Sequence, residues 1–287
     1  MATRFPSQSR QAGFTLVELI MVIVILGVIG GTVAVFMKGP IDAYFDTARR
    51  AGIADVADTT VRRMARDLRK ALPNSIRVVP GATVGTDCIE FIPTRMGGRY
   101  RAQDIVPVPT DNTSLRFDAA DDSFNMLGIN TALPADQRIQ NGDLVAVYNL
   151  GIAGASAYAG DNTVAVSGVA VSPANVSETR ISLLSPSLKF PLESPTRRFH
   201  VIPFDEKVVS YICSGTKLLY RNTNYGYATS CPAPTLGTTP IIASEATCSF
   251  AYDNSDMRNG LVKLSLTFSS AGESVSVYHE VHVNNTP

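Results

Sequence analysis

The feature that most constrains this chain is an apolar stretch from Phe14 to Met37 in which Glu18 is the only charged residue. As a helix, its 24 residues would rise about 36 Å, enough to cross a hydrocarbon core of roughly 30 Å with some tilt. An ionised carboxylate is costly inside a bilayer and is seldom without a role there. The pattern therefore predicts a membrane-spanning helix whose carboxylate needs a positive partner.

The segment before this stretch, residues 1–13, carries Arg4 and Arg10 and no acidic residue. An ordinary secretory signal is cut after its apolar core, which is then lost. Here a cut after Gly13 would keep the apolar helix and place a new amine on Phe14, four residues from Glu18. A plain signal anchor would explain the hydrophobicity but not the carboxylate.

The order Gly13-Phe14-Thr15-Leu16-Val17-Glu18 resembles the N-terminus of the type IV pilin and pseudopilin superfamily. In that family a prepilin peptidase cuts after the glycine and N-methylates the phenylalanine, and the glutamate guides assembly. The resemblance implies cleavage between Gly13 and Phe14, methylation of Phe14, and an assembly role for Phe14 and Glu18. The helix proline of many pilins is replaced here by Val35, with Pro40 later as a possible kink. This departure favours a minor pilin or pseudopilin over a major pilin.

The charge and cysteine content of the chain indicate its cellular compartment and restrict its possible binding partners. The formal net charge is zero, and loss of Arg4 and Arg10 would leave 23 basic and 25 acidic residues, a charge of −2, which does not support a nucleic-acid partner. The basic leader predicts a cytoplasmic N-terminus, so the remainder should face the periplasm. The cysteines lack the CxxC spacing of zinc sites, and their even number suits an oxidising compartment. They are Cys88, Cys213, Cys231 and Cys248. Two disulfides are predicted; of the three possible pairings, Cys213–Cys231 with Cys88–Cys248 is favoured.

Helical spacing resumes after Pro40 and Pro73 should end it, which predicts a stalk from Phe14 to Leu72. Within it, Asp58/Arg62 and Arg63/Asp67 are spaced as surface ion pairs. Strands are expected beyond it, and Asn259-Gly260 should form a type I′ turn in a C-terminal three-stranded meander. The expected strands are 88–92, 143–148, 182–184, 208–213, 218–220, 248–252, 261–268 and 274–283, with a further turn at Ala271-Gly272. Residues 151–168 and 223–239 are expected to be surface loops.

A second resemblance covers most of the chain. Three segments, residues 62–78, 142–151 and 278–285, look like those of MshO-type minor pilins, which are encoded with the mannose-sensitive haemagglutinin (MSHA) pilus machinery and look like relatives of the J-type minor pseudopilins of type II secretion. The resemblance implies a low-abundance subunit near the filament tip that helps to start assembly.

No catalytic motif is present, so an enzyme is not expected. His282 shares a strand face with Glu280 and Tyr278, while His279 lies opposite; a Glu/His pair provides fewer ligands than the three or four that a metal site needs, and a solvated face is favoured. The remaining histidine is His200.

Two loops are rich in side-chain oxygens, and some minor pseudopilins bind calcium in the head. The loops contain Asp118, Asp121 and Asp122, and Asp253, Asn254 and Asp256. Neither cluster matches the twelve-residue calcium loop, so turn chemistry is favoured. The stripe of Arg62, Arg66 and Arg69 is interpreted as a solvated stalk face rather than a site for a neighbouring subunit or DNA.

Together these observations predict an α+β protein. It comprises a cleaved cytoplasmic leader (1–13), an N-terminal helix (14–72, of which 14–37 spans the membrane and assembles and 41–72 packs on the head) and a β-rich periplasmic head (73–287). The expected function is a structural, non-enzymatic minor pilin in the inner membrane and then the pilus. Its expected partners are other pilins, the prepilin peptidase and the inner-membrane assembly platform, with no cofactor. The alternatives are a J-type pseudopilin of type II secretion, and a signal-anchored periplasmic enzyme or binding domain.

Overall fold

The computed structural model describes residues 13–105, 112–184, 190–227, 231–256 and 258–287. The chain divides into two compact units, Met1–Gly52 and Ile53–Pro287. The predicted leader, residues 1–13, lies outside the described residues except for Gly13. The α+β class is confirmed, because one long helix is followed by fourteen strands within the described part of the chain.

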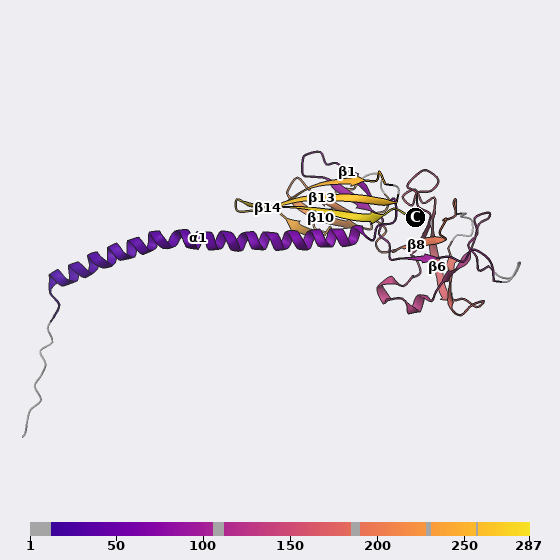
Figure 1. Ribbon diagram of the computed structural model, residues 1–287, viewed down its shortest axis with the longest axis horizontal. Helices are drawn as coiled ribbons and strands as arrows, with labels where there is room; N and C mark the ends of the chain where they lie inside the picture. Colours follow the sequence, from indigo (N-terminus) through magenta and orange to yellow (C-terminus); the bar gives the residue numbers. More distant parts are fainter. Residues whose placement is uncertain (1–12, 106–111, 185–189, 228–230, 257) are drawn as a thin grey trace, which may run out of the picture. The chain divides into compact units, whose positions relative to one another are not determined.

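The N-terminal helix, α1 (Leu16–Leu68), continues through Pro40 (Figure 1). It ends four residues before the predicted Leu72, and Pro73 is not what ends it. The Leu72 N–H donates to the Ile92 carbonyl at 2.7 Å, and Ala71 bridges Pro93. The chain leaves the helix because these backbone groups pair with the segment that follows β2 (Cys88–Phe91).

Two antiparallel sheets share one hydrophobic core with the end of α1. The first has the order β1-β2-β9-β10-β11 and the second the order β12-β13-β14. On α1, the buried positions recur at helical spacing and include Val61, Met64 and Leu68. They pack with Leu264 and Leu266 of the central strand β13 and with other buried side chains of both sheets. The remaining bounds are β1 Arg77–Val79, β9 Val209–Cys213, β10 Leu218–Thr223, β11 Ile241–Ser244, β12 Ala246–Asp253, β13 Asn259–Ser270 and β14 Glu273–Asn284.

A third, six-stranded antiparallel sheet has the order β3-β8-β5-β6-β7-β4 and its own core. Its two outer strands approach each other, because Tyr100 bridges Met126 and the Arg101 N–H donates to the Asn125 carbonyl at 2.9 Å. The sheet thus curls toward a closed barrel around Phe124 and Phe199, whose rings meet edge to face at 5.3 Å. Its strands are β3 Met96–Arg99, β4 Ser123–Leu127, β5 Leu144–Val147, β6 Thr163–Val171, β7 Glu178–Leu183 and β8 Arg198–Ile202; two 3₁₀ turns, Asn130–Ala132 and Ala135–Gln137, follow β4.

The C-terminal meander is confirmed, but one of its turns is not where the sequence placed it. Gly260 lies inside β13 and pairs with Val283, so the predicted type I′ turn at Asn259-Gly260 is wrong. A Cβ at Gly260 would lie 2.6 Å from the Tyr252 ring, so close packing explains this glycine. The predicted turn at Ala271-Gly272 is confirmed, and both residues have positive φ, +48° and +87°. These angles are those of a type I′ turn.

Each of the other predicted strands overlaps an observed one, but the predictions 88–92, 143–148, 182–184 and 208–213 extend one residue past one or both ends of β2, β5, β7 and β9, and β8, among others, was not predicted. The expected loop 151–168 is interrupted by β6, whose Thr, Val and Ala residues pair with β5 and β7. The expected loop 223–239 is free of helix and strand from Asn224 onward where it is described; residues 228–230 lie outside the described residues.

All four cysteines form disulfides, as predicted, but the favoured pairing is wrong. The bonds are Cys88–Cys231 and Cys213–Cys248. Cys213 of β9 meets Cys248 of β12 inside the shared core, so this bond joins the five- and three-stranded sheets. Cys88–Cys231 instead fastens the 224–239 loop to β2. Sheet topology decides which cysteines meet, and the sequence pattern does not contain it.

Candidate processing and assembly site

The predicted processing site lies at the start of α1. Gly13 and Phe14 precede the helix in non-helical backbone, and Phe14 is 89% exposed. A Cβ at Gly13 would meet no atom within 4 Å, and its φ is not in the left-handed region. Neither packing nor backbone conformation therefore requires glycine at this position.

Glu18 has a local partner that the sequence analysis missed. Both the backbone N–H and the hydroxyl of Thr15 donate to Glu18 Oε2 at 2.9 Å. The Glu18 N–H donates back to the Thr15 hydroxyl oxygen at 3.3 Å. Because Thr15 immediately precedes the first helical residue, this reciprocal pair is a capping box that satisfies amide groups otherwise unpaired at a helix start. The Thr-x-x-Glu spacing was the signal that could have revealed it.

The capping box uses one carboxylate oxygen of Glu18 and leaves the other, Oε1, without a hydrogen bond among the described residues. The apolar side chains that follow, from Leu16 to Met37, are exposed in the chain. By length and composition α1 can cross a membrane. The N-terminal part of α1 thus presents a continuous apolar surface with one capped carboxylate at its beginning.

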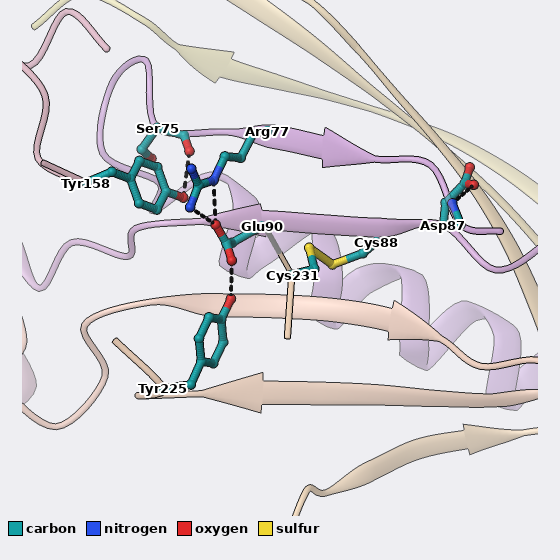
Figure 2. The surroundings of a disulfide bond; sticks show 9 residues. Ser75, Arg77, Asp87, Cys88, Glu90, Tyr158, Tyr225 and Cys231 are labelled. Atoms are coloured by element: carbon teal, nitrogen blue, oxygen red, sulfur yellow. Dashed lines mark hydrogen bonds and ion pairs between the residues drawn. A yellow bond between two sulfur atoms is a disulfide. The ribbon is translucent and has the colours of Figure 1, made fainter. Parts of the chain in front are cut away.

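A buried ionic cluster that sequence reasoning did not find lies beside the Cys88–Cys231 disulfide (Figure 2). The Glu90 side chain is fully buried. Its carboxylate accepts hydrogen bonds from Arg77 Nε at 2.5 Å and from the Tyr225 hydroxyl at 2.6 Å. The Arg77 guanidinium lies 3.6 Å from the Tyr158 ring centroid, and the Tyr158 hydroxyl donates to the Ser75 carbonyl. Burial, and then the Glu90 charge, raise the pKa of Tyr158. Arg77 and Glu90 are brought together by antiparallel pairing of β1 with β2, for which local sequence offers no signal.

The histidines do not gather into a site. His279 and His282 lie on opposite faces of β14, and His282 shares the exposed face with Glu280 and Tyr278, as predicted. His200 lies on β8, where burial and then Arg198 lower its pKa to about 4. Within the described ranges, no group of three or more His, Cys, Asp or Glu side chains is placed to hold a metal ion.

The two oxygen-rich clusters bond to their own turns. Asp121 Oδ2 accepts the Arg116 N–H at 2.9 Å, and Asp122 Oδ1 accepts the Ser123 hydroxyl at 2.9 Å. Asp253 Oδ1 accepts the Ser255 N–H at 3.0 Å, and Asp256 Oδ1 accepts the Arg258 N–H at 3.0 Å. This is the turn chemistry that the sequence analysis favoured.

All three residues of the arginine stripe are exposed: Arg62 and Arg66 lie on α1, and Arg69 follows its last residue. Arg62 pairs with Asp58 at 2.6 Å as predicted. In place of the second predicted pair, Arg63 with Asp67, the Asp67 carboxylate contacts residues of the sheet. Asp67 accepts Arg221 Nε at 2.9 Å and the Tyr211 hydroxyl at 2.8 Å. Asp67 thereby ties the end of α1 to β9 and β10.

Comparison with known proteins adds one match. Residues 8–34 match the prokaryotic N-terminal methylation motif, a stretch that includes Gly13, Phe14 and Glu18. Comparisons with curated proteins and with solved structures give no match. The chain therefore carries a type IV pilin-like N-terminus on a membrane-capable helix, followed by a disulfide-bonded unit rich in antiparallel sheet.

Proposed function

We propose that this protein is a minor pilin: a structural, non-enzymatic subunit that helps to start or cap a type IV pilus of the MSHA type. The match to the N-terminal methylation motif carries this proposal. The MSHA assignment rests on the resemblance of residues 62–78, 142–151 and 278–285 to MshO-type proteins.

Processing after Gly13 is compatible with the freedom of that glycine. No packing contact or backbone angle requires glycine at this position, so recognition by a peptidase that binds the segment in extended form would not conflict with the fold. Cleavage would release the basic leader on the cytoplasmic side and leave Phe14 as a methylated amine.

Assembly through Glu18 is supported by the geometry of the capping box. Thr15 occupies Oε2, so Oε1 is available to an amine. A Phe14 amine from the same chain or from a neighbouring subunit would neutralise the carboxylate within an apolar environment. Gly27 and Gly31 are spaced as GxxxG, and a Cβ at either meets nothing within 4 Å. Such glycines let helices approach closely in lipid or in a filament core.

In this proposal the protein spans the inner membrane once, with its head in the periplasm, before it enters the pilus, most naturally at the tip. Its partners are other pilins, the prepilin peptidase and the assembly platform. Two disulfides in Ile53–Pro287 suit a periplasmic location. The signal-anchored enzyme or binding domain is less well supported, because it gives no account of the methylation motif.

Mass spectrometry of the N-terminus of the purified protein tests the proposal. The expected polypeptide begins with methylated Phe14. A chain that still begins with Met1 would rule out the pilin assignment. Rescue of piliation rather than of protein export in a deletion strain would separate the MSHA-type subunit from the second candidate, a J-type pseudopilin of type II secretion.

A further inference from the structure

Two arginines of the six-stranded sheet lie directly opposite each other on neighbouring strands. β3 and β8 pair antiparallel, and their register sets Arg99 against Arg198. Phe199 and Val201 of β8 belong to the core of this sheet, so Arg198 and His200 lie on its outer face. Like charges in directly opposed positions of a sheet repel each other. This pair therefore lowers stability unless a negative charge lies beside the two guanidinium groups.

The chain itself supplies no such charge in contact with them. Arg198 is half-buried, Arg99 is exposed, and the exposed Arg197 immediately precedes β8. Within the described residues, none of these three side chains forms an ion pair or a hydrogen bond. Burial, and then Glu193, raise the pKa of Tyr100 to about 12, so a carboxylate lies nearby, yet it forms no ion pair with the three arginines. Their positive charges are left without a direct partner.

Arg198 is an exception among the partly buried arginines of Ile53–Pro287. Burying a charge is costly unless the charge is paired, and the other partly buried arginines in the described part of this unit each contact an acidic side chain or a hydroxyl. These contacts are Arg77–Glu90, Arg95–Asp143, Arg101–Glu178, Arg116–Asp104, Arg180–Ser123 and Arg221–Asp67. The stability of the fold therefore does not explain an unpaired Arg198 set against a second arginine.

The two opposed arginines line a hollow on the outer face of the sheet. Its volume is about 460 Å³, and its lining includes Gly97, Arg99, Leu127 and Arg198. A Cβ at Gly97 would meet no atom closer than 3.5 Å, so packing does not demand glycine there, and the missing side chain adds room. A second hollow of about 250 Å³ shares Arg99 and Leu127 with the first and is also lined by Arg197. The larger volume is in the range of pockets that hold small molecules.

We propose that Arg99 and Arg198, with Arg197 beside them, bind a small molecule that presents a phosphate or carboxylate group. The anionic oxygens of both groups match the fork of donors on a guanidinium. An anion held by both arginines replaces their repulsion by two charge-assisted contacts. Leu127, which is 49% exposed, offers apolar surface to the rest of the molecule. Such a site requires neither cleavage after Gly13 nor entry into a filament, so its failure would leave the proposed function intact.

Calorimetric titration of the full chain in detergent with inorganic phosphate and, separately, with citrate tests the proposal. NaCl at matched ionic strength controls for screening. The variants Arg99→Gln and Arg198→Gln each remove one charge of the opposed pair. Arg66→Gln is the matched control, because Arg66 is an exposed arginine on α1 that does not line the hollow. Thermal unfolding of each protein without added anion provides a second measurement.

The expected result is saturable binding of phosphate, citrate or both to the natural protein and to Arg66→Gln. Binding of one anion alone identifies the group that the site recognises. Arg99→Gln and Arg198→Gln should each weaken binding about tenfold. Without the anion, the same two variants should unfold at a higher temperature than the natural protein, because the repulsion between like charges is removed. A purely structural role for the arginines would not produce both changes.

Three outcomes would overturn the proposal. The first is no saturable binding of either anion, or binding that NaCl reproduces at the same ionic strength. The second is unchanged affinity in Arg99→Gln or Arg198→Gln. The third is weaker binding together with a lower unfolding midpoint in these variants, which would assign the two arginines to the fold.

Discussion

The Arg77 guanidinium on β1 forms an ion pair with the fully buried Glu90 carboxylate on β2 (Figure 2). The same carboxylate accepts the hydroxyl of Tyr225, so the pair also contacts the segment that follows β10. Antiparallel pairing places Arg77 and Glu90 opposite each other, although thirteen positions separate them in the chain.

Replacing Arg77 by Met should destabilise the unit Ile53–Pro287. The Glu90 carboxylate would stay buried without its cation and would keep the hydrogen bond from the Tyr225 hydroxyl. Removing one partner of a buried ion pair costs about 3–5 kcal/mol. Urea unfolding of the full chain in detergent measures the loss. The double variant Arg77→Met with Glu90→Leu is the control and should recover part of it. Equal stability of Arg77→Met and the natural protein would contradict the role assigned to this pair.

Removing the Cys88–Cys231 bond should destabilise the protein without detaching one sheet from the other. The bond closes a sequence separation of 143 residues, and loss of a native disulfide typically costs about 2–5 kcal/mol. Cys88→Ala with Cys231→Ala should lower the unfolding midpoint, while Cys213–Cys248 remains intact. Peptide mapping without reduction should recover peptides joined as 88–231 and 213–248. A 213–231 peptide from the natural protein would refute the observed connectivity.

His200 should make stability depend on pH. Burial lowers its pKa from 6.5 to about 4 in the folded chain, so the unfolded chain binds a proton more readily. The stabilisation is therefore fully present above about pH 6.5 and is lost as the pH falls toward 4, by up to about 3 kcal/mol. His200→Gln should flatten this part of the stability profile, measured by urea unfolding at several pH values. Parallel profiles for the two proteins would be inconsistent with a suppressed pKa.

Ala271 should tolerate replacement by Gly better than its neighbour tolerates the reverse change. Both turn residues have positive φ, which costs an L-residue about 1–2 kcal/mol and glycine nothing comparable. Ala271→Gly should raise the free energy of unfolding by up to about 1 kcal/mol, whereas Gly272→Ala should lower it. Thermal unfolding of the two variants provides the comparison. The same sign for both would argue against a type I′ turn here.

Local patterns predicted much of this fold, and most of the failures concern contacts between distant parts of the chain. Apolar spacing indicated α1, and alternation indicated β13 and β14, because these signals are contained in contiguous residues. The Asn259-Gly260 dipeptide misled the prediction because Gly260 is needed for close packing against Tyr252. The disulfide pairing and the Arg77–Glu90 pair depend on which strands become neighbours, and local sequence does not carry that information. The bonds between Thr15 and Glu18 are a different kind of failure, because the local Thr-x-x-Glu spacing could have indicated them and was overlooked.

Glu18→Ala should leave membrane insertion intact but impair entry into filaments. The apolar stretch from Leu16 to Met37 is retained, so the energetic basis of insertion is unchanged or improved. What is lost is the carboxylate that would meet the Phe14 amine of a neighbouring subunit and that also caps α1 through Thr15. Membrane fractionation and immunoblotting of sheared filaments measure the two steps separately.

Thr15→Ala distinguishes the two roles of Glu18. This variant removes the hydroxyl of the capping box but keeps the carboxylate, so it tests helix capping without removing the charge. If the charge guides assembly, Thr15→Ala should enter filaments far better than Glu18→Ala. Equal defects in both variants would instead assign the effect to the start of the helix, and normal filament entry by Glu18→Ala would remove the carboxylate from the proposed mechanism.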